Sequence, residues 1–92
     1  MEYVVYVLYS ISYDKIYIGY TSNLIERFKS HNAQGTKGWT LRFRPWQVVY
    51  LDYFTDKGSA IQRERLLKGA KARKEIRQNI ADQYNRVGII SA

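Results

Sequence analysis

The stretch from Lys15 to His31, KIYIGYTSNLIERFKSH, constrains the fold more than any other part of the chain. Residues 15–20 predict a short strand, residues 21–22 a turn, and a helix is expected to open at Asn23. The Asn23 side chain can accept a hydrogen bond from the first helical turn, while Glu26 reaches back toward the cap. A strand that runs directly into a capped helix fixes the side chains of both elements relative to one another.

The predicted helix carries a basic pair beside an apolar stripe. Arg27 and His31 are four residues apart, so they lie together on one rim of the stripe. The stripe itself consists of Leu24, Ile25 and Phe28. We expect the pair at the seam between helix and sheet, half desolvated, facing a strand that contains Tyr17, Gly19 and Tyr20. A basic pair in this position predicts an anion site.

Length and composition limit the class of protein. The 92 residues, with 46% hydrophobic content and no cysteine, predict a single domain over residues 1–92 that folds without disulfides. We expect its core over about residues 3–84 and a tail over residues 85–92. Because neither an apolar run of membrane-spanning length nor a signal-peptide pattern follows Met1, a soluble, cytoplasmic protein is expected.

The charge balance indicates a polyanionic partner. Fifteen Lys and Arg residues against eight Asp and Glu residues give a formal net charge of +7. Nucleic acid is the leading partner, because no predicted helix combines the wide apolar face and the lysine-rich face that an anionic membrane surface would bind. A solvated basic surface that aids solubility stays open as the alternative.

Two further strands and two further helices are predicted. The strands cover Tyr3–Tyr9 and Trp46–Phe54, and the helices cover Ser59–Gly69 and about Lys71–Tyr84. Ser59 and Gln62 form the capping signature of the first of these helices.

The strands Tyr3–Tyr9 and Lys15–Tyr20 predict an antiparallel hairpin. A loop centred between residues 11 and 12 places Leu8 opposite Lys15. The same loop places Tyr6 directly opposite Tyr17, so that two phenols project from one face of the sheet. A register shifted by one residue would break this arrangement.

Glu64 lies in the middle of the inward face of the predicted helix 59–69. The rest of that face is formed by Ala60, Ile61 and Leu67. A carboxylate among apolar side chains is costly unless it is paired or bound to a metal. The structural alternative is a salt bridge to an arginine such as Arg27. The functional one is a ligand for a hard divalent cation, most simply Mg²⁺, which commonly takes only one or two protein carboxylates.

Aromatic and basic residues interleave in the predicted exposed loop over residues 33–45. Such a surface can stack on bases and neutralise phosphates. For Trp39 the alternative is a cover over the edge of the core. The residues predicted to bind nucleic acid, in this loop and elsewhere, are Lys15, Lys37, Trp39, Arg42, Arg44, Lys68 and Lys71.

Several catalytic sets are excluded by composition. The single histidine rules out the usual multi-histidine zinc sites, and the lack of cysteine removes a thiol nucleophile. No glycine-rich loop of nucleotide-binding spacing is present, which argues against chemistry driven by a nucleoside triphosphate.

The remaining candidates form a pattern of separated residues. The pattern consists of Tyr6, Tyr17-Ile18-Gly19, Arg27, His31 and Glu64. It resembles the GIY-YIG nuclease superfamily, in particular the small stand-alone bacterial members that are similar to the excinuclease N-terminal domain. The likeness covers about Tyr3 to Ile80. The first signature reads Val4-Val5-Tyr6 and lacks the family's nominal glycine, but it keeps the chemically needed tyrosine.

The resemblance implies an α/β (α+β) fold in which a three-stranded antiparallel sheet is flanked by helices. It also implies metal-dependent hydrolysis of a DNA phosphodiester, with one Mg²⁺ or Mn²⁺ ion. A structure-selective role in DNA repair or recombination, and RNA as a substrate, stay open. Two alternatives from other classes stay open as well: a nucleic-acid-binding module without activity, and a subunit that works only with a protein partner.

The resemblance further implies a role for each residue around the reacting phosphate. Tyr6 would act as general base on the attacking water, with Tyr17 hydrogen-bonded nearby to the water or phosphate. Arg27 would neutralise charge on the transition state. His31 would orient a tyrosine or relay a proton, and Glu64 would hold the metal ion.

Two further residues and one pH dependence follow from the same resemblance. Gly19 would leave room for the backbone or the substrate to approach closely. Asn79 would be the counterpart of the family's terminal asparagine, which many small members lack. Because a free tyrosine titrates near pH 10, a phenol that acts as a base needs neighbouring positive charge, from Arg27, the metal or Lys15. An alkaline optimum and a strong dependence on divalent cation are therefore expected.

Overall fold

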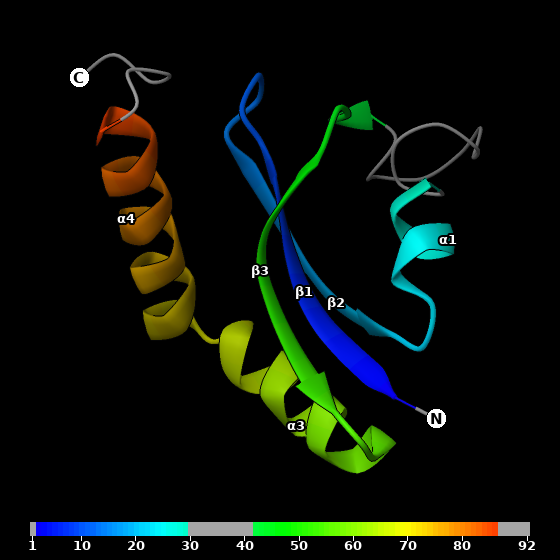
Figure 1. Ribbon diagram of the computed structural model, residues 1–92. Coiled ribbons are helices and arrows are strands. Elements are labelled where there is room, and N and C mark those ends of the chain that lie inside the picture. The colour runs from blue at the N-terminus through cyan, green and yellow to red at the C-terminus, as the bar shows by residue number, and fades with distance from the viewer. Residues whose placement is uncertain (1, 30–41, 87–92) are drawn as a thin grey trace.

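An antiparallel sheet of three strands, in the order β2-β1-β3, forms the centre of the fold (Figure 1). The computed structural model describes residues 2–29 and 42–86. Its elements are β1 (Tyr3–Ser10), β2 (Lys15–Thr21), α1 (Leu24–Lys29), β3 (Gln47–Phe54), α3 (Lys57–Leu67) and α4 (Ala70–Arg86). The predicted antiparallel sheet flanked by helices is confirmed.

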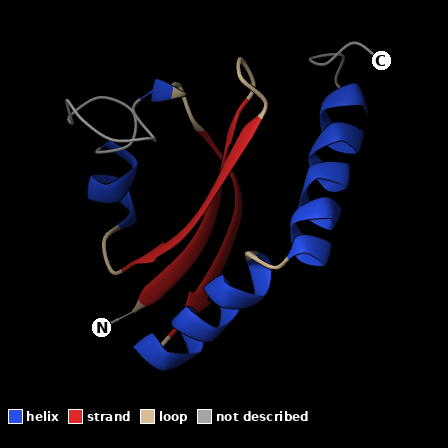
Figure 2. Ribbon diagram, turned by 180° about the vertical axis from the view of Figure 1, so that it is seen from behind, coloured by secondary structure: helices blue, strands red, loops and turns tan. Residues whose placement is uncertain are grey.

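Helices cover both faces of the sheet. Helix α1 lies on one side and α4 on the other, while α3 crosses one end of the sheet (Figure 2). On the α3 and α4 side, alternate residues of β1 and β2 pack against Ala60, Leu67 and Ile80. The central strand β1 is buried on both faces from Val4 to Ser10, so its near-continuous apolar sequence is explained by its position.

The core on the α1 side is smaller. Tyr6, Leu8 and Trp46 are buried there, and α1 contributes Leu24 and Phe28. These two helical residues are four positions apart and therefore point to the same face. Ile25, which the sequence placed in the same stripe, is instead 69% exposed, because the short helix turns only one narrow side toward the sheet.

The hairpin of β1 and β2 is antiparallel as predicted, but its register differs by two residues. Leu8 pairs with Tyr17 rather than with Lys15, and Tyr6 lies opposite Gly19 rather than opposite Tyr17. A shift of two residues keeps every side chain on the expected face, whereas a shift of one would not. Tyr6 and Tyr17 therefore still project from the same face, as diagonal neighbours.

A shorter loop accompanies the change of register, because the predicted pair of Leu8 and Lys15 would leave residues 9–14 unpaired. The last pair before the loop joins Ser10 to Lys15, which leaves residues 11–14 as the loop. Asp14 adopts a left-handed conformation with φ of 53°. Its carboxylate Oδ1 accepts hydrogen bonds from the Tyr9 hydroxyl at 3.0 Å and from Arg77 Nη1 of α4 at 3.1 Å. The loop is thus held in place by contacts that come from outside it.

The caps of the helices follow short-range chemistry. Asn23 caps α1 as predicted, because its Oδ1 accepts from the Glu26 backbone N–H at 3.2 Å. Asp56, not Ser59, caps α3: its carboxylate accepts from the Ser59 backbone N–H and hydroxyl, both at 2.8 Å. The predicted start of that helix at Ser59 is therefore too late.

The last strand and the last helix also differ slightly from the predicted bounds. Strand β3 begins at Gln47, one residue after the predicted Trp46. Helix α4 extends past the predicted end at Tyr84 to Arg86. Within the described parts of the chain, no helix has both the length and the apolar character needed to cross a lipid bilayer.

Candidate active site

Gly19 and Tyr6 form the centre of the candidate site. The two residues are directly opposite one another, so the Tyr6 ring extends over a position on β2 that carries no side chain. A Cβ atom at position 19 would lie 2.6 Å from Tyr6 Oη, 2.8 Å from Tyr6 Cζ and 3.1 Å from Tyr17 Cε1. The expectation that this glycine leaves room for backbone or substrate is thereby corrected: the phenol of Tyr6 fills the space.

Tyr6, Tyr17 and Arg27 meet at this point. The centroids of the two phenol rings are 6.2 Å apart, and the ring planes are tilted by 31°. The Arg27 guanidinium donates hydrogen bonds to the hydroxyls of Tyr6 and Tyr17. Both bonds raise the pKa of Arg27, and the bond to Tyr6 has the larger effect. The Arg27 backbone N–H donates to the Asn23 carbonyl at 3.1 Å. The capped first turn of α1 thus places the guanidinium at the seam between helix and sheet.

Burial dominates the electrostatics of Tyr6. The side chain is 1% exposed, and this desolvation raises the pKa of Tyr6 from its ordinary 10.0 to about 12. The hydrogen bond from Arg27 opposes the rise, while the charges of Tyr17 and Glu64 add to it. Without an additional cation the Tyr6 phenol therefore stays protonated at neutral pH, and further positive charge is required before it can act as a base.

Glu64 acts on this site from the other layer of the molecule. Helix α3 packs through Ala60 and Leu67 against the sheet face opposite to Tyr6. The Glu64 charge nevertheless raises the pKa of Tyr6, so the two groups interact although they come from opposite sides of the sheet. The structure brings Tyr6, Tyr17, Arg27 and Glu64 into one electrostatic neighbourhood.

Contacts on both sides of Glu64 fix its part of α3. The preceding residue, Arg63, donates from Nη2 to the Tyr50 hydroxyl at 3.0 Å, and that hydroxyl donates to Asp52 Oδ2, also at 3.0 Å. Glu64 itself pairs with Lys68, one helical turn later, with 2.8 Å between Oε1 and Nζ. The ion pair that the structure gives Glu64 is thus to Lys68 and not to Arg27, the alternative that the sequence left open. Lys68, predicted to bind nucleic acid, is engaged by this carboxylate.

The chemistry of this carboxylate suits a hard divalent cation. Its side chain is 15% exposed and already attracts the Lys68 ammonium, so the position accepts positive charge. In residues 2–29 and 42–86, no three His, Cys, Asp or Glu residues gather as a metal-binding group. A single carboxylate is the mode in which Mg²⁺ binds with water and phosphate oxygens as its other ligands. Glu64 thus fits the predicted ion.

Other predicted nucleic-acid contacts gather around Phe43, next to the hairpin loop. Lys15 Nζ lies 5.5 Å and Arg42 Cζ 5.4 Å from the centroid of the Phe43 ring. The Tyr13 ring meets the edge of Phe43 with 5.4 Å between centroids, and Arg44 is exposed beside it. Sequence reasoning missed Tyr13, although an aromatic residue in an otherwise polar turn was the available signal.

Trp46 belongs to the small core against which both Phe43 and Tyr17 pack. It is buried with Tyr6 and Leu8, and its ring contacts Tyr17 edge-on, with 6.4 Å between centroids. The sequence placed Trp46 only at the start of a strand. Its role in the core was missed because a lone aromatic at a strand boundary does not show which face it will occupy.

Two predicted residues lie away from the tyrosines. Asn79 and Lys71 line a groove of about 610 Å³ between α3 and α4, together with Tyr50 and Leu67 of the opposite core. The assignment of Asn79 to the catalytic site is therefore corrected, because α4 covers the other face of the sheet. His31, Lys37 and Trp39 lie outside the described residues.

Comparison with known proteins identifies the class that this fold and site define. The sequence profile of the GIY-YIG catalytic domain matches residues 2–78. The chain belongs to the GIY-YIG family, and its domain is of nuclease type. The predicted resemblance is confirmed.

Small relatives share most of this domain. The chain is 35% identical over 75 residues to a UPF0213 protein of Natronomonas pharaonis, covering 80% of this chain and 87% of that protein. It is 44% identical over 55 residues to a UPF0213 protein of Lactiplantibacillus plantarum, covering 58% of this chain and about half, 54%, of that protein. The solution NMR structure of a UPF0213 protein from Bacillus halodurans is similar, with a TM-score of 0.51 and 26% identity over 83% of this chain and 82% of that chain.

One larger relative carries a functional name. The chain is 33% identical over 91 residues to the structure-specific endonuclease subunit SLX1 of Debaryomyces hansenii. The match covers 91% of this chain but only 26% of that protein. The likeness therefore concerns a portion of the larger protein.

Proposed function

We propose that the chain is an endonuclease that hydrolyses a DNA phosphodiester bond with the help of one divalent cation. The observation that supports this most directly is the convergence of Tyr6, Tyr17 and Arg27 beside Gly19, where the Glu64 charge also acts on Tyr6. Membership of the GIY-YIG catalytic-domain family supports nuclease chemistry. The formal net charge of +7 favours a polyanionic substrate.

Arg27 is the proposed contact to the substrate phosphate. Its inner side hydrogen-bonds with two phenols, while the residue as a whole is exposed. A guanidinium held from behind can present its outer N–H groups to a phosphate and stabilise the charge that develops in the transition state. His31 is proposed to orient a tyrosine or relay a proton.

Tyr6 and Tyr17 are proposed to act on the attacking water. Tyr17 holds the water or phosphate by its hydroxyl, and Tyr6 accepts the proton that the water loses. A divalent cation held by Glu64 would supply positive charge beside the phosphate and the leaving oxygen. Because burial raises the pKa of Tyr6 to about 12, we expect cleavage to increase toward alkaline pH and to depend strongly on the cation.

Cleavage assays test the proposal directly. Flap, branched, nicked and single-stranded DNA would be incubated with Mg²⁺ or Mn²⁺, against EDTA. Removal of a general base typically lowers rate by about 10²–10⁴-fold, and we expect losses of this order for Tyr6→Phe and at least as large for Glu64→Gln. Glu75→Gln, an exposed carboxylate on α4, is the matched control and should leave cleavage unchanged.

The two variants test different parts of the proposal. Near-normal cleavage by Tyr6→Phe would show that another group is the base. Cleavage that survives Glu64→Gln, or that persists in EDTA, would show that the metal assignment is wrong or that a contaminant cuts the DNA.

A second candidate is a subunit that is active only with a protein partner. The observation that favours it is the similarity to a protein named as an endonuclease subunit. Metal-dependent cleavage by the purified chain alone would decide against this candidate. Binding without cleavage of any of the four DNA forms would favour it, or a module that only binds.

A further inference from the structure

The end of the β1–β2 hairpin carries aromatic and basic side chains that the proposed reaction does not use. We define the hairpin-tip cluster as Tyr13, Lys15, Arg42, Phe43 and Arg44. Two cations lie over one ring of the cluster, and a second ring meets its edge, all within 5.4–5.5 Å of the Phe43 centroid. The cluster is thus a compact patch built from two segments that are far apart in the sequence.

The exposure of this cluster points to a ligand. Tyr13 is 52% exposed, and Lys15, Arg42 and Arg44 are also exposed, while Phe43 is half-buried against the core. Tyr13 differs from Tyr53, which is also exposed, in that its ring contacts Phe43, over which Lys15 and Arg42 lie. The neighbouring Asp14 does not oppose an anion strongly, because Arg77 pairs with its carboxylate at 3.1 Å.

The cluster lies on the same face of the sheet as the candidate active site. Lys15, Tyr17 and Gly19 alternate along β2 and therefore share one face. Gly19 is four positions along the strand from Lys15, a span of roughly 13 Å. The cluster is thus within reach of the same short strand of nucleic acid.

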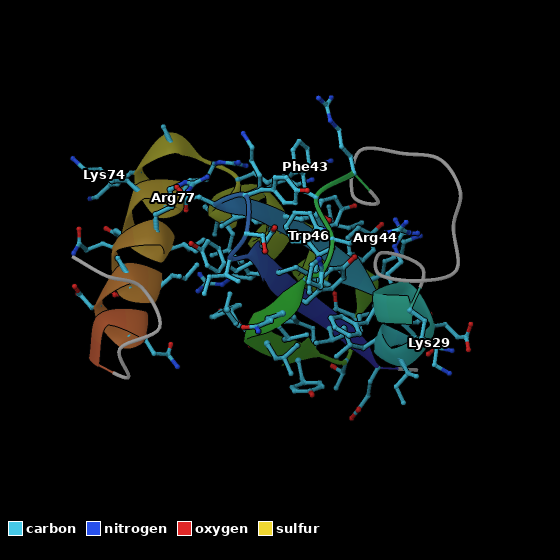
Figure 3. All side chains as sticks on the ribbon, turned by 90° about the horizontal axis from the view of Figure 1, so that it is seen from above. Lys29, Phe43, Arg44, Trp46, Lys74 and Arg77 are labelled. Carbon is cyan, nitrogen blue, oxygen red and sulfur yellow. The ribbon has the colours of Figure 1, made fainter. Side chains whose placement is uncertain are left out.

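Figure 3 shows Phe43 and Arg44 near Trp46, and Lys74 and Arg77 on α4. The basic residues of α4 reach the hairpin loop only from its other side, where Arg77 pairs with Asp14. The hairpin-tip cluster is therefore the basic and aromatic surface that adjoins the tyrosines.

The combination of rings and cations selects an unpaired strand. Bases in a duplex are stacked on one another and do not offer a free π-face, whereas unpaired bases stack on aromatic side chains. Lysine and arginine beside the rings neutralise the phosphates of the same strand. We propose that the hairpin-tip cluster binds unpaired nucleotides of the strand whose phosphate enters the site of Tyr6, Tyr17 and Arg27. The claim that this strand also enters the site of the tyrosines rests on the proposed function. The claim that the cluster binds unpaired nucleotides does not.

Binding without cleavage tests the subsite by itself. Fluorescence anisotropy in EDTA would compare a labelled thymidine oligonucleotide of about 12 nucleotides with the blunt duplex of the same length, using the full chain. We expect tighter binding of the single strand. Tyr13→Ala should weaken that binding by about tenfold, whereas Tyr13→Phe, which keeps a ring, should retain it.

Matched controls come from exposed residues outside the cluster. Tyr53→Ala removes a tyrosine of β3 that is 63% exposed and should leave binding unchanged. Arg42→Gln should weaken binding and reduce the slope of log affinity against log salt by about 1, whereas Arg65→Gln on α3 should change it less. Equal effects of Tyr13→Ala and Tyr53→Ala, or equal affinity for duplex and single strand, would overturn the proposal.

Two further outcomes separate this proposal from others. Glu64→Gln is expected to bind the single strand as the wild type does, so loss of cleavage in that variant does not affect the subsite. If no DNA is cleaved but the Tyr13 and Arg42 effects hold, the subsite stands and the proposed hydrolysis fails. If an acidic peptide competes fully and its binding depends on Arg42 but not on Tyr13, the cluster is a protein-docking surface and the proposal is overturned.

Discussion

The position of the Tyr6 ring depends on Gly19, because the ring fills the space that a side chain at position 19 would occupy. The Tyr6 hydroxyl lies where a Cβ atom of residue 19 would be only 2.6 Å away. The same ring is held by Arg27 from the outer side and by buried Trp46 and Leu8 from within. A single methyl group is therefore sufficient to displace the phenol that the proposed reaction needs.

We predict that Gly19→Ala lowers both stability and cleavage. The added methyl would overlap Tyr6 and approach Tyr17 Cε1 to 3.1 Å, and overpacking of this kind typically costs about 1–3 kcal/mol in the free energy of unfolding. Urea unfolding measures the stability, and the cleavage assay reports the displaced phenol.

Gly69→Ala is the control for this substitution. Its Cβ would meet only the Leu66 carbonyl oxygen at 3.4 Å, an ordinary contact. This variant should be neutral or more stable by about 0.4–1 kcal/mol. A Gly19→Ala protein as stable and as active as the wild type would show that the Tyr6 ring can occupy another position.

At the scale of the elements, strands, helices and their caps follow from local patterns, while the register of the hairpin depends on a more distant contact. The hairpin was expected from its two apolar runs, but its loop is fixed partly by Arg77, which is 63 residues from Asp14. The predicted start of α3 rested on Ser59 and Gln62, although Asp56, three residues earlier, is an equally good capping residue. The structure selects Asp56, whose pKa is lowered by the backbone and side-chain hydrogen bonds from Ser59.

The pair of Glu64 and Lys68 on α3 leads to a prediction about the cation. The Lys68 ammonium occupies Glu64 Oε1 at 2.8 Å and would compete with a divalent ion for the carboxylate. Ion pairs of this kind are typically worth about 0.2–1 kcal/mol, so Lys68→Gln should tighten Mn²⁺ binding by about two- to fivefold. Calorimetric titration of the DNA-free protein with Mn²⁺ measures this affinity.

Two variants control the metal experiment. Lys57→Gln removes an exposed lysine at the start of the same helix and should leave Mn²⁺ affinity nearly unchanged. Glu64→Gln should abolish the binding. Unchanged affinity in Lys68→Gln would mean that the ion binds elsewhere or that Lys68 moves aside without cost.

At the scale of the whole molecule, the sheet separates two different surfaces. The tyrosines, Arg27 and the hairpin-tip cluster share one face, while the groove lined by Asn79 and Lys71 lies on the other. Glu64 links the two sides, because its charge raises the pKa of Tyr6 from the other side of the sheet. The pattern of residue types predicted the members of the site, but their placement in two layers could not be predicted, since it depends on how Ala60 and Leu67 pack.

Burial of Tyr6 in this arrangement makes the stability of the whole fold sensitive to alkaline pH. The pKa of Tyr6 is about 12 in the folded protein against an ordinary 10.0, so between these values the folded state keeps a proton that the unfolded chain has released. The folded state then binds more protons, and the free energy of unfolding decreases as pH rises. This contribution is complete below pH 10 and is lost as pH rises through about 12, a total change of about 3 kcal/mol.

Urea unfolding at a series of pH values from 9 to about 12 isolates this contribution if wild type and Tyr6→Phe are compared. All other ionisable groups are common to the two proteins, so their contributions cancel in the difference. We expect the free energy of unfolding to decrease less steeply in Tyr6→Phe, because phenylalanine has no proton to lose. Tyr53→Phe, which changes a tyrosine that is 63% exposed, should follow the wild-type curve. Parallel curves for wild type and Tyr6→Phe would mean that the pKa of the Tyr6 phenol is not raised by burial. The phenol could then serve as a base at a pH closer to neutral than its burial implies.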